Sequence, residues 1–428
     1  MITAILSLEL IRGPFPIVVE CLGGLALLAL LVGRRPARWL PVAALAAGAG
    51  AGIGYAVCWL VSDVVDVFGV SLSPASRAWF SAAAAAVAVA AARTIVLRGR
   101  GIVTGVASVV VFVLAAALGI NADLGEFPQV KNVLGISGYG DIRLPVVEAA
   151  GSGPSGWVAP KGMPAQGRIG MVTIPAPISG FRARAALVYL PPAALAANAP
   201  KLPVVEMFSG QPGGPEQMFT AGQLGESLNV YAHAHRGLAP IVVVPDQLGA
   251  PNHNPMCVNS PLGNSATYLT VDVPRWIRTH LNVLRGREDW AVGGFSQGGT
   301  CAIQFGAGHP RVFGNIVDIS GQIAPRSGDL RHTVDSGFAG SMSRYEAATP
   351  KRMLQEHAPY QDTLGLFAVG QLDSRFAPGV TAVAGYAARA GMSTRLFLSP
   401  GTAHDWHTVH FAVDRSLALL GAKWGFDD

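Results

Sequence analysis

The stretch Trp290-Ala-Val-Gly-Gly-Phe-Ser-Gln-Gly-Gly-Thr300 places a serine where a buried strand is expected to turn abruptly into a helix. Its centre, Gly294-Phe-Ser-Gln-Gly298, fits the G-x-S-x-G pattern of a nucleophile elbow, in which the serine takes a strained backbone conformation. The elbow glycines Gly294 and Gly298 are needed because a Cβ atom at either position would crowd the turn. A chain with 52 glycines can form this pattern by chance, so the flanking strand, the helix and partner residues must support Ser296 as a nucleophile.

Composition separates the chain into two parts. Of its 428 residues, 50% are hydrophobic and only 13% charged, which indicates membrane segments. The first 120 residues hold eight Lys and Arg against four Asp and Glu, and the remainder holds 23 against 22. The sequence pI near 9.2 therefore reflects arginines of the amino-terminal part, and we expect no nucleic-acid surface.

Four apolar runs lie in this part: Phe15 to Gly33, Trp39 to Val61, Trp79 to Ala92 and Ile102 to Ile120. Three are long enough to cross a bilayer, whereas the third is short and rich in alanine. We expect a transmembrane region of about four helices over residues 1–120, a linker over 121–168 that is most flexible from Gly151 to Gly156, and a catalytic domain over 169–428.

Charge predicts the orientation of these helices. Arginines follow the first and third runs, at Arg34, Arg35, Arg38, Arg93, Arg98 and Arg100, whereas the middle loop carries Asp63 and Asp66 with only Arg77. By the positive-inside rule, we expect a multi-pass protein of the cell membrane with its catalytic domain on the outer, extracytoplasmic face. Gly48, Gly50, Gly52 and Gly54 in the second run would serve either dimerisation or, the interpretation we favour, packing inside the bundle.

From Gly170 onward, short β-rich runs alternate with helical stretches. Strands are expected at 171–174, 185–190, 204–208, 241–245, 291–292, 316–319, 366–369 and 394–398, and helices at 271–284, 300–305, 380–389 and from Trp406. This alternation predicts an α/β domain with a mostly parallel sheet.

A serine hydrolase on such a sheet needs a base and an acid in the order Ser, Asp/Glu, His. His404 follows the last expected strand, where the base should be, and at most one of His404, His407 and His410 can face Ser296. Asp373 follows the strand 366–369, where a carboxylate would orient the base. Its rivals are weaker, since Asp405 adjoins His404, Asp318 lies inside a strand and Asp362 precedes one.

An oxyanion hole is expected beside the serine. The strand 204–208 runs into Ser209-Gly-Gln-Pro-Gly-Gly214, and the backbone N–H groups of Gln211 and Gln297 would together bind a tetrahedral oxyanion. The alternative interpretation of this loop is a Gly/Pro turn with no ligand.

The sequence from about Gly170 to Gly425 resembles α/β-hydrolase esterases of the esterase D type and, among them, the antigen 85 group of mycolyltransferases. The resemblance lies in Phe208-Ser-Gly-Gln211, Val242-Val-Val-Pro245, Thr267 to Trp276, the elbow, Ile319-Ser-Gly321 and His404-Asp-Trp406. It implies that Ser296 is the nucleophile, His404 the base, and Gln211 and Gln297 the oxyanion donors.

The chain departs from this family's pattern at two positions. Ser209 stands where the family has Asp or His, and Asp373 where the mycolyltransferases carry Glu. Neither transferase activity nor trehalose as acceptor therefore follows from the resemblance, which also leaves out the amino-terminal helices.

The chain has four cysteines. Cys21 and Cys58 lie in membrane runs, and Cys257 and Cys301 could form a disulfide in the outer domain, although spacing alone does not show that they meet. We find no metal-ligand spacing and expect no cofactor.

The expected function is acyl transfer through an acyl-enzyme on an ester or acyl-lipid substrate, an envelope lipid or acylated glycan, beside the lipid bilayer. The acceptor, water or a sugar hydroxyl, and the oligomeric state are left open. The alternatives are a catalytically inactive binding or scaffold module, and a peptidase, for which no separate signal exists.

Overall fold

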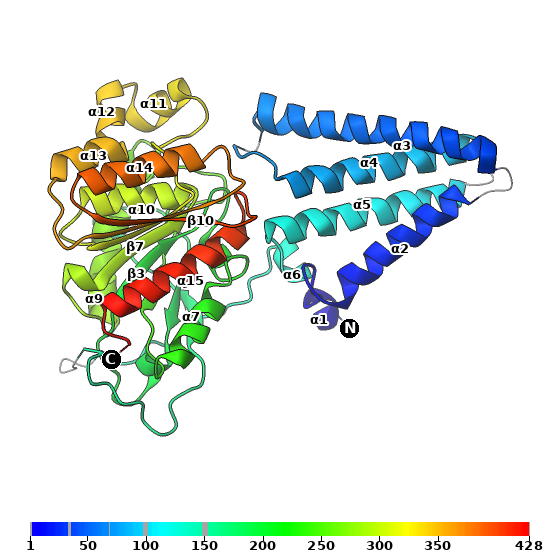
Figure 1. Cartoon of the computed structure of the whole chain (residues 1–428). Helices are drawn as coiled ribbons and strands as arrows, with labels where there is room; N and C mark the ends of the chain where they lie inside the picture. Colours follow the sequence, from blue (N-terminus) through cyan, green and yellow to red (C-terminus); the bar gives the residue numbers. More distant parts are fainter. Residues whose placement is uncertain (1, 33–35, 68, 97–101, 148–152, 428) are drawn as a thin grey trace. The chain divides into compact units, whose positions relative to one another are not determined.

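The computed structural model of the chain describes residues 2–32, 36–67, 69–96, 102–147 and 153–427 (Figure 1). The chain divides into two compact units: Met1–Ile136 with His404–Trp406, and Ser137–Ala403 with His407–Asp428. Six residues named above, Gly33, Arg34, Arg35, Arg98, Arg100 and Gly151, lie outside the described ranges.

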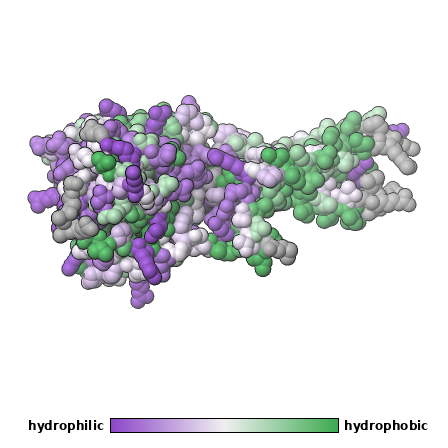
Figure 2. Space-filling model, turned by 90° about the horizontal axis from the view of Figure 1, so that it is seen from below, coloured by the Kyte–Doolittle hydropathy of each residue, from purple (hydrophilic) through white to green (hydrophobic). Residues whose placement is uncertain are grey.

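The first unit is helical. Its helices are α1 (Ile2–Leu6), α2 (Pro14–Leu31), α3 (Pro36–Trp59) with a π-helical extension (Leu60–Val64), α4 (Pro74–Val96), α5 (Ile102–Leu124) and α6 (Val130–Val133). Within its described residues, four segments are long and apolar enough to cross a membrane: Pro14–Leu31, Ala37–Val64, Pro74–Val96 and Ile102–Leu124. Figure 2 shows hydrophobic residues gathered over these helices. The predicted four apolar helices are therefore present, and they suggest a membrane protein.

The third apolar run is longer than the sequence predicted. Helix α4 has 23 residues and not only the stretch from Trp79 to Ala92. Pro74 starts it at a position where the missing N–H costs nothing, and Arg77 lies inside its first turn instead of in a loop. The Arg77 guanidinium pairs with the Asp63 carboxylate at 2.6 Å. Arg93, also expected in a loop, belongs to the last turn. Its guanidinium donates to the Val32 carbonyl at 2.9 Å, so both arginines are held by neighbouring residues at the helix ends.

Glycines of α3 pack closely against α4. A Cβ atom on Gly50 would lie 2.6 Å from the carbonyl oxygen of Ala84, and one on Gly54 would lie 2.9 Å from the Cα atom of Ser81. Gly48 and Gly52, in contrast, have nothing within 4 Å of such an atom. Helix packing inside the bundle accounts for the first pair.

We predict that Gly50→Ala destabilises the helical unit and that Gly52→Ala does not. Both changes add the same methyl group and the same gain in helix propensity, but only at position 50 does the methyl meet backbone, at a cost of about 1–3 kcal/mol. Thermal unfolding of the full chain in detergent micelles measures the difference, and equal melting temperatures would contradict the packing.

The second unit is built on an eight-stranded sheet. The strands are β1 (Arg168–Val172), β2 (Ala186–Leu190), β3 (Val204–Phe208), β4 (Ile241–Val244), β7 (Trp290–Phe295), β8 (Asn315–Ile319), β9 (Leu364–Gly370) and β10 (Ser393–Ser399). Their order is β1-β2-β4-β3-β7-β8-β9-β10. The six strands from β4 to β10 run parallel, while β2 is antiparallel to both β1 and β4. The mostly parallel α/β sheet that the sequence predicted is confirmed. A separate hairpin pairs β5 (Asn259–Ser260) with β6 (Gly263–Asn264).

Helices cover both faces of this sheet. The helices of this unit are α7 (Leu224–Ala234), α8 (Ser265–Thr267), α9 (Val273–His280), α10 (Gln297–Gly308), α11 (Leu330–Phe338), α12 (Met342–Ala347), α13 (Pro350–His357), α14 (Ala377–Arg389) and α15 (Trp406–Lys423). Figure 1 shows α10, α13 and α14 on one face and α7 and α15 on the other. The rings of Phe208 and Phe305 pack edge to face, with centroids 5.7 Å apart, where α10 lies on the central strands.

One predicted helix ends early. The sequence placed a helix over 271–284, but α9 stops at His280. The next residues are extended because Leu202 binds them: its N–H donates to the Asn282 carbonyl at 3.1 Å, and its carbonyl accepts from Leu284 at 2.9 Å. A tertiary contact with the segment before β3 overrides the local helical pattern.

Candidate active site

Ser296 occupies the turn between β7 and α10 with a positive φ, at φ 57° and ψ −116°. Its N–H donates to the Ile319 carbonyl at 2.8 Å, and its carbonyl accepts from the Thr300 N–H at 3.0 Å. A non-glycine residue held at positive φ costs free energy and persists only where its surroundings impose it. Here the sheet imposes it from one side and the first turn of α10 from the other.

The two elbow glycines leave room for this turn. A Cβ atom on Gly294 would collide with the carbonyl oxygen of Gly298, and one on Gly298 would collide with the carbonyl oxygen of Ser209. The strand β7 and the helix α10 therefore approach each other, and the loop after β3, only because both positions lack side chains.

The loop after β3 lies beside the serine. Phe208 pairs with Gly294 in the parallel register, so Ser209 and Gly210 leave the sheet next to the elbow. A Cβ atom on Gly210 would lie 3.6 Å from the Cβ atom of Ser296. Gln211 follows on this loop, and Gln297 is the first residue of α10. The two expected oxyanion donors thus belong to the two segments that flank Ser296.

Asp373 follows β9 at the same edge of the sheet, where the parallel strands end. The residue is 4% exposed, and its carboxylate accepts from the Phe376 N–H at 3.0 Å. Its backbone N–H donates to the Gly370 carbonyl at 3.0 Å. Asp362, its rival, precedes β9 and so lies at the opposite edge from Ser296.

The loop that carries His404 connects β10 with α15 and touches the loop that carries Asp373. The N–H of Gln371 donates to the Ser399 carbonyl at 2.9 Å, and that of Leu372 to the Thr402 carbonyl at 2.8 Å. The Thr408 hydroxyl closes the turn on the Ala403 carbonyl at 2.8 Å. His404 follows Ala403 directly, as Asp373 follows Leu372.

The other two histidines of this segment are His407 and His410. His410 Nε2 lies 2.9 Å from the Ala221 carbonyl, and the rings of His407 and His410 stand edge to face with centroids 6.0 Å apart. Asp405 is buried.

Asp318 is a buried carboxyl on β8, directly opposite Gly294 in the register. One oxygen accepts from the Gly321 N–H at 2.9 Å, and the other has no hydrogen-bond partner among the described residues. Burial raises the pKa of Asp318 to about 8, with the Gly321 hydrogen bond opposing it. At neutral pH the group is therefore protonated, unlike a carboxylate that must stabilise a histidinium ion.

Two amide residues that the sequence analysis did not single out also lie here. Gln247, which follows β4, is 0% exposed, and Asn254 is 7% exposed. Gln247 Nε2 donates to the Ser209 carbonyl at 2.7 Å and to Gln297 Oε1 at 3.2 Å. The signal that could have found Gln247 is its place at the carboxyl end of a buried parallel strand, where sites gather in α/β sheets.

The cysteines Cys257 and Cys301 form a disulfide with their Cα atoms 5.5 Å apart. Cys301 lies one turn after Gln297 in α10. Cys21 and Cys58 are free thiols. Among the residues that the structure describes, no group of three or more His, Cys, Asp or Glu could hold a metal ion.

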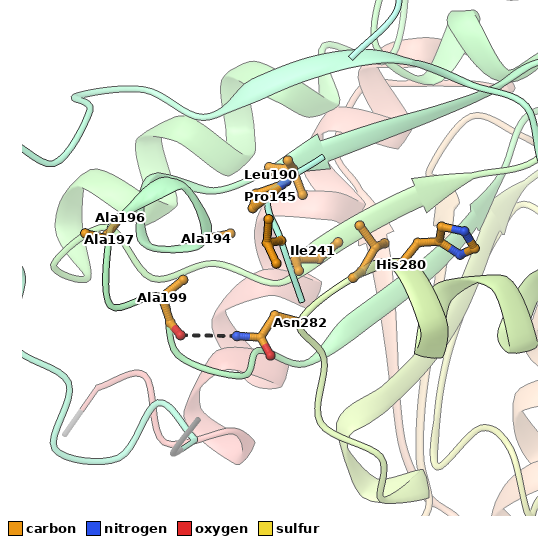
Figure 3. Close-up of a pocket in the computed structure, with 11 residues that line it drawn as sticks. Pro145, Leu190, Ala194, Ala196, Ala197, Ala199, Ile241, His280 and Asn282 are labelled. Carbon is orange, nitrogen blue, oxygen red and sulfur yellow. Dashed lines mark hydrogen bonds between the residues drawn. The ribbon is translucent and has the colours of Figure 1, made fainter. Parts of the chain in front are cut away.

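A cavity of about 160 Å³ lies away from these residues, at the edge where the parallel strands begin. Figure 3 shows Leu190, Ile241 and several alanines around it, with Asn282 donating to the Ala199 carbonyl at 3.1 Å. The residues that line it are mostly apolar and include no nucleophile, so we do not assign this cavity as the active site.

We predict that Asp318→Asn makes the protein more stable, increasingly so toward pH 8. The folded state keeps a proton on Asp318 that the unfolded chain releases above pH 3.8, so wild-type stability falls as pH rises from about 4 to about 8. Asparagine keeps the Gly321 hydrogen bond without a titrating group, and the gain at pH 8 reaches a few kcal/mol. Unfolding measured from pH 5 to 8.5 decides it, because parallel pH profiles for the two proteins would contradict a buried neutral Asp318.

The sheet order, the strand–serine–helix turn and the order of the loops define an α/β-hydrolase fold. Two solved structures share it: a ferulic acid esterase (TM-score 0.52, 17% identity, 62% of this chain and 100% of that one) and an S-formylglutathione hydrolase from Agrobacterium tumefaciens (TM-score 0.51, 17% identity, 61% and 97%). At this identity the likeness concerns the fold, and it confirms the predicted fold class.

The family follows from the sequence comparison. The esterase family model, described as "Putative esterase", matches residues 182–408, which is more than half of the chain. The chain therefore belongs to this esterase family. It is also 32% identical over 252 residues to an uncharacterized protein of Corynebacterium glutamicum, covering 58% of this chain and 59% of that protein. The chain thus spans about three fifths of the length of the curated relative it matches.

Proposed function

We propose that this chain is a membrane-anchored serine esterase or acyltransferase that works through an acyl-enzyme on Ser296. The observation that carries the proposal is the backbone of Ser296, held at φ 57° between β7 and α10 where glycines clear the turn. A strained serine between strand and helix costs stability, so its retention favours a chemical role.

In the first half-reaction, His404 removes the proton of the Ser296 hydroxyl, whose oxygen attacks the ester carbonyl carbon. The carbonyl oxygen becomes an oxyanion, to which the backbone N–H groups of Gln211 and Gln297 donate. Asp373 orients His404 and stabilises its charged form. The tetrahedral intermediate collapses, the C–O bond to the alcohol breaks, and His404 gives its proton to the leaving oxygen.

In the second half-reaction, His404 takes the proton of an acceptor hydroxyl, whose oxygen attacks the acyl carbon. The ester bond to Ser296 breaks, and His404 returns the proton to the Ser296 oxygen. Water as acceptor makes the protein an esterase, and a sugar hydroxyl makes it an acyltransferase. The departures at Ser209 and Asp373 give no support to trehalose as that acceptor.

The substrate class follows from location. Four apolar helices suggest a membrane protein, and the arginine distribution favours a catalytic unit on the extracytoplasmic face of the cell membrane. An enzyme tethered there meets envelope lipids and acylated glycans, both of which include compounds with ester bonds.

The first test is labelling of Ser296. We expect the full chain in detergent micelles to react with one equivalent of a fluorophosphonate probe, and Ser296→Ala to lose the label completely. Ser343→Ala, at an exposed serine of α12, should label like the wild type. A folded wild-type chain that does not label would instead support an inactive binding or scaffold module.

The second test separates the two buried aspartates. Asp373→Asn should lower kcat for p-nitrophenyl acetate on the order of 10³-fold or more, because the base loses its orienting carboxylate. Asp318 lies on β8, two strands from β10, and is already neutral. Asp318→Asn should therefore keep kcat within about threefold, a change too small to reflect loss of a triad member. The reverse pattern would move the acid to β8.

A further inference from the structure

A ring of amide side chains joins the two segments that flank Ser296. On one side, Gln247 Nε2 donates to the Ser209 carbonyl at 2.7 Å and to Gln297 Oε1 at 3.2 Å. The reversed orientation of this amide would set its oxygen against the Ser209 carbonyl, so the hydrogen bonds fix which end is the donor.

On the other side, Asn254 completes the ring. Gln297 Nε2 donates to Asn254 Oδ1 at 3.2 Å, and Asn254 Nδ2 reaches Gln211 Oε1 at 3.4 Å. The backbone from Ser209 through Gly210 to Gln211 closes the circuit. Asn254 is held in turn by the Arg326 carbonyl, at 3.0 Å from its Nδ2, and by the Met256 N–H, at 2.9 Å from its Oδ1.

The disulfide fastens this ring to α10. Gln297 Nε2 lies 3.2 Å from Cys301 Sγ, and the Cys257–Cys301 bond ties the segment that follows Asn254 to the first turns of the helix. Gln247, Asn254 and Gln297 are all at least nine-tenths buried, so losing one partner leaves a desolvated polar group and destabilises the arrangement of the others.

We propose that Gln247 and Asn254 are positioning residues for the oxyanion hole, which hold the Ser209–Gln211 loop and the start of α10 at one fixed separation. This inference rests on the proposed function, because it concerns the two backbone donors assigned there. An oxyanion hole requires its donors at fixed distances from an atom that exists only in the transition state, and they belong here to segments far apart in the sequence. The ring couples those segments directly.

Kinetics test the proposal in the full chain. Gln247→Leu puts a side chain of similar size in place and removes both donors. We expect kcat for p-nitrophenyl acetate to fall about 10- to 100-fold with KM within about twofold, since transition-state contacts alone are weakened. Inhibition by phenylboronic acid, which forms a tetrahedral adduct on the serine, should weaken by the same factor as kcat. Asn254→Leu should behave alike.

The matched control is Gln304→Leu. Gln304 is also buried in α10, but its Nε2 donates only to the Ala348 carbonyl, at 3.1 Å, outside the ring. It should lose comparable thermal stability while keeping kcat and boronate affinity. A Gln247→Leu protein that keeps its kcat, or one whose kcat loss is matched by Gln304→Leu, would overturn the positioning role.

Hydrogen–deuterium exchange supplies a readout independent of turnover. In Gln247→Leu, peptides covering 209–214 and 295–301 should both exchange faster, and in Gln304→Leu the first should not change. Faster exchange in only one of the two segments would overturn the coupling. If the wild-type chain fails to react with the fluorophosphonate, the proposed function is overturned. If the wild type reacts and Gln247→Leu keeps its kcat and boronate affinity, only this inference is overturned.

Discussion

The positive φ of Ser296 is the constraint on which the second unit depends. Because β7 turns into α10 within one residue, the first turn of the helix packs directly against the sheet. The space between them admits backbone atoms but no side chains. Gly294 and Gly298 satisfy this condition toward each other and toward Ser209. The neighbouring strand β3 can then end beside the serine, and the loops after β9 and β10 follow along the same edge.

The unit buries carboxyl groups in two different ways. Asp246, after β4, is desolvated, which by itself raises its pKa, but hydrogen bonds from Arg184 and the Leu248 N–H outweigh burial and hold the pKa below its usual range. Glu206, inside β3, is fully buried with neither oxygen partnered among the described residues, and burial raises its pKa well above its usual range. Asp318 resembles Glu206. A paired carboxylate therefore anchors the Ser209–Gly214 loop through Arg184, which also donates to the Gly213 carbonyl at 2.8 Å, while neutral acids pack within the sheet.

Much of this architecture could be predicted from local sequence, because parallel strands buried on both faces are continuous apolar runs. Strand β3 matches its predicted range of 204–208, and the elbow was recognisable from its glycines. The helices α11 to α13 between β8 and β9 were not predicted, since each is short and has few apolar residues to form a helical pattern. The caps Asp329 and Thr349 are local signals that could have been used. The disulfide pair could be named, but its geometry could not.

The amide ring lay beyond sequence reasoning for a different reason. Gln and Asn carry no charge and no nucleophile, and Gln247, Asn254 and Gln297 acquire a common role only when β4 and α10 are brought together. The early end of α9 also depends on a tertiary contact, since Leu202 pairs with residues that the local sequence pattern assigns to helix.

The strand order has a consequence for how the chain reaches this state during synthesis. The neighbours of β3 are β4 and β7, so the central pairing of Val204–Phe208 with Trp290–Phe295 waits until the whole intervening segment has been made. Before then, β3 presents an apolar edge with unpaired N–H and C=O groups, which is the kind of surface that invites aggregation. The helices α2 to α5 precede it in the chain and leave the ribosome first. In a nascent chain the apolar helices α2 to α5 have therefore left the ribosome well before β3 and β7 can pair.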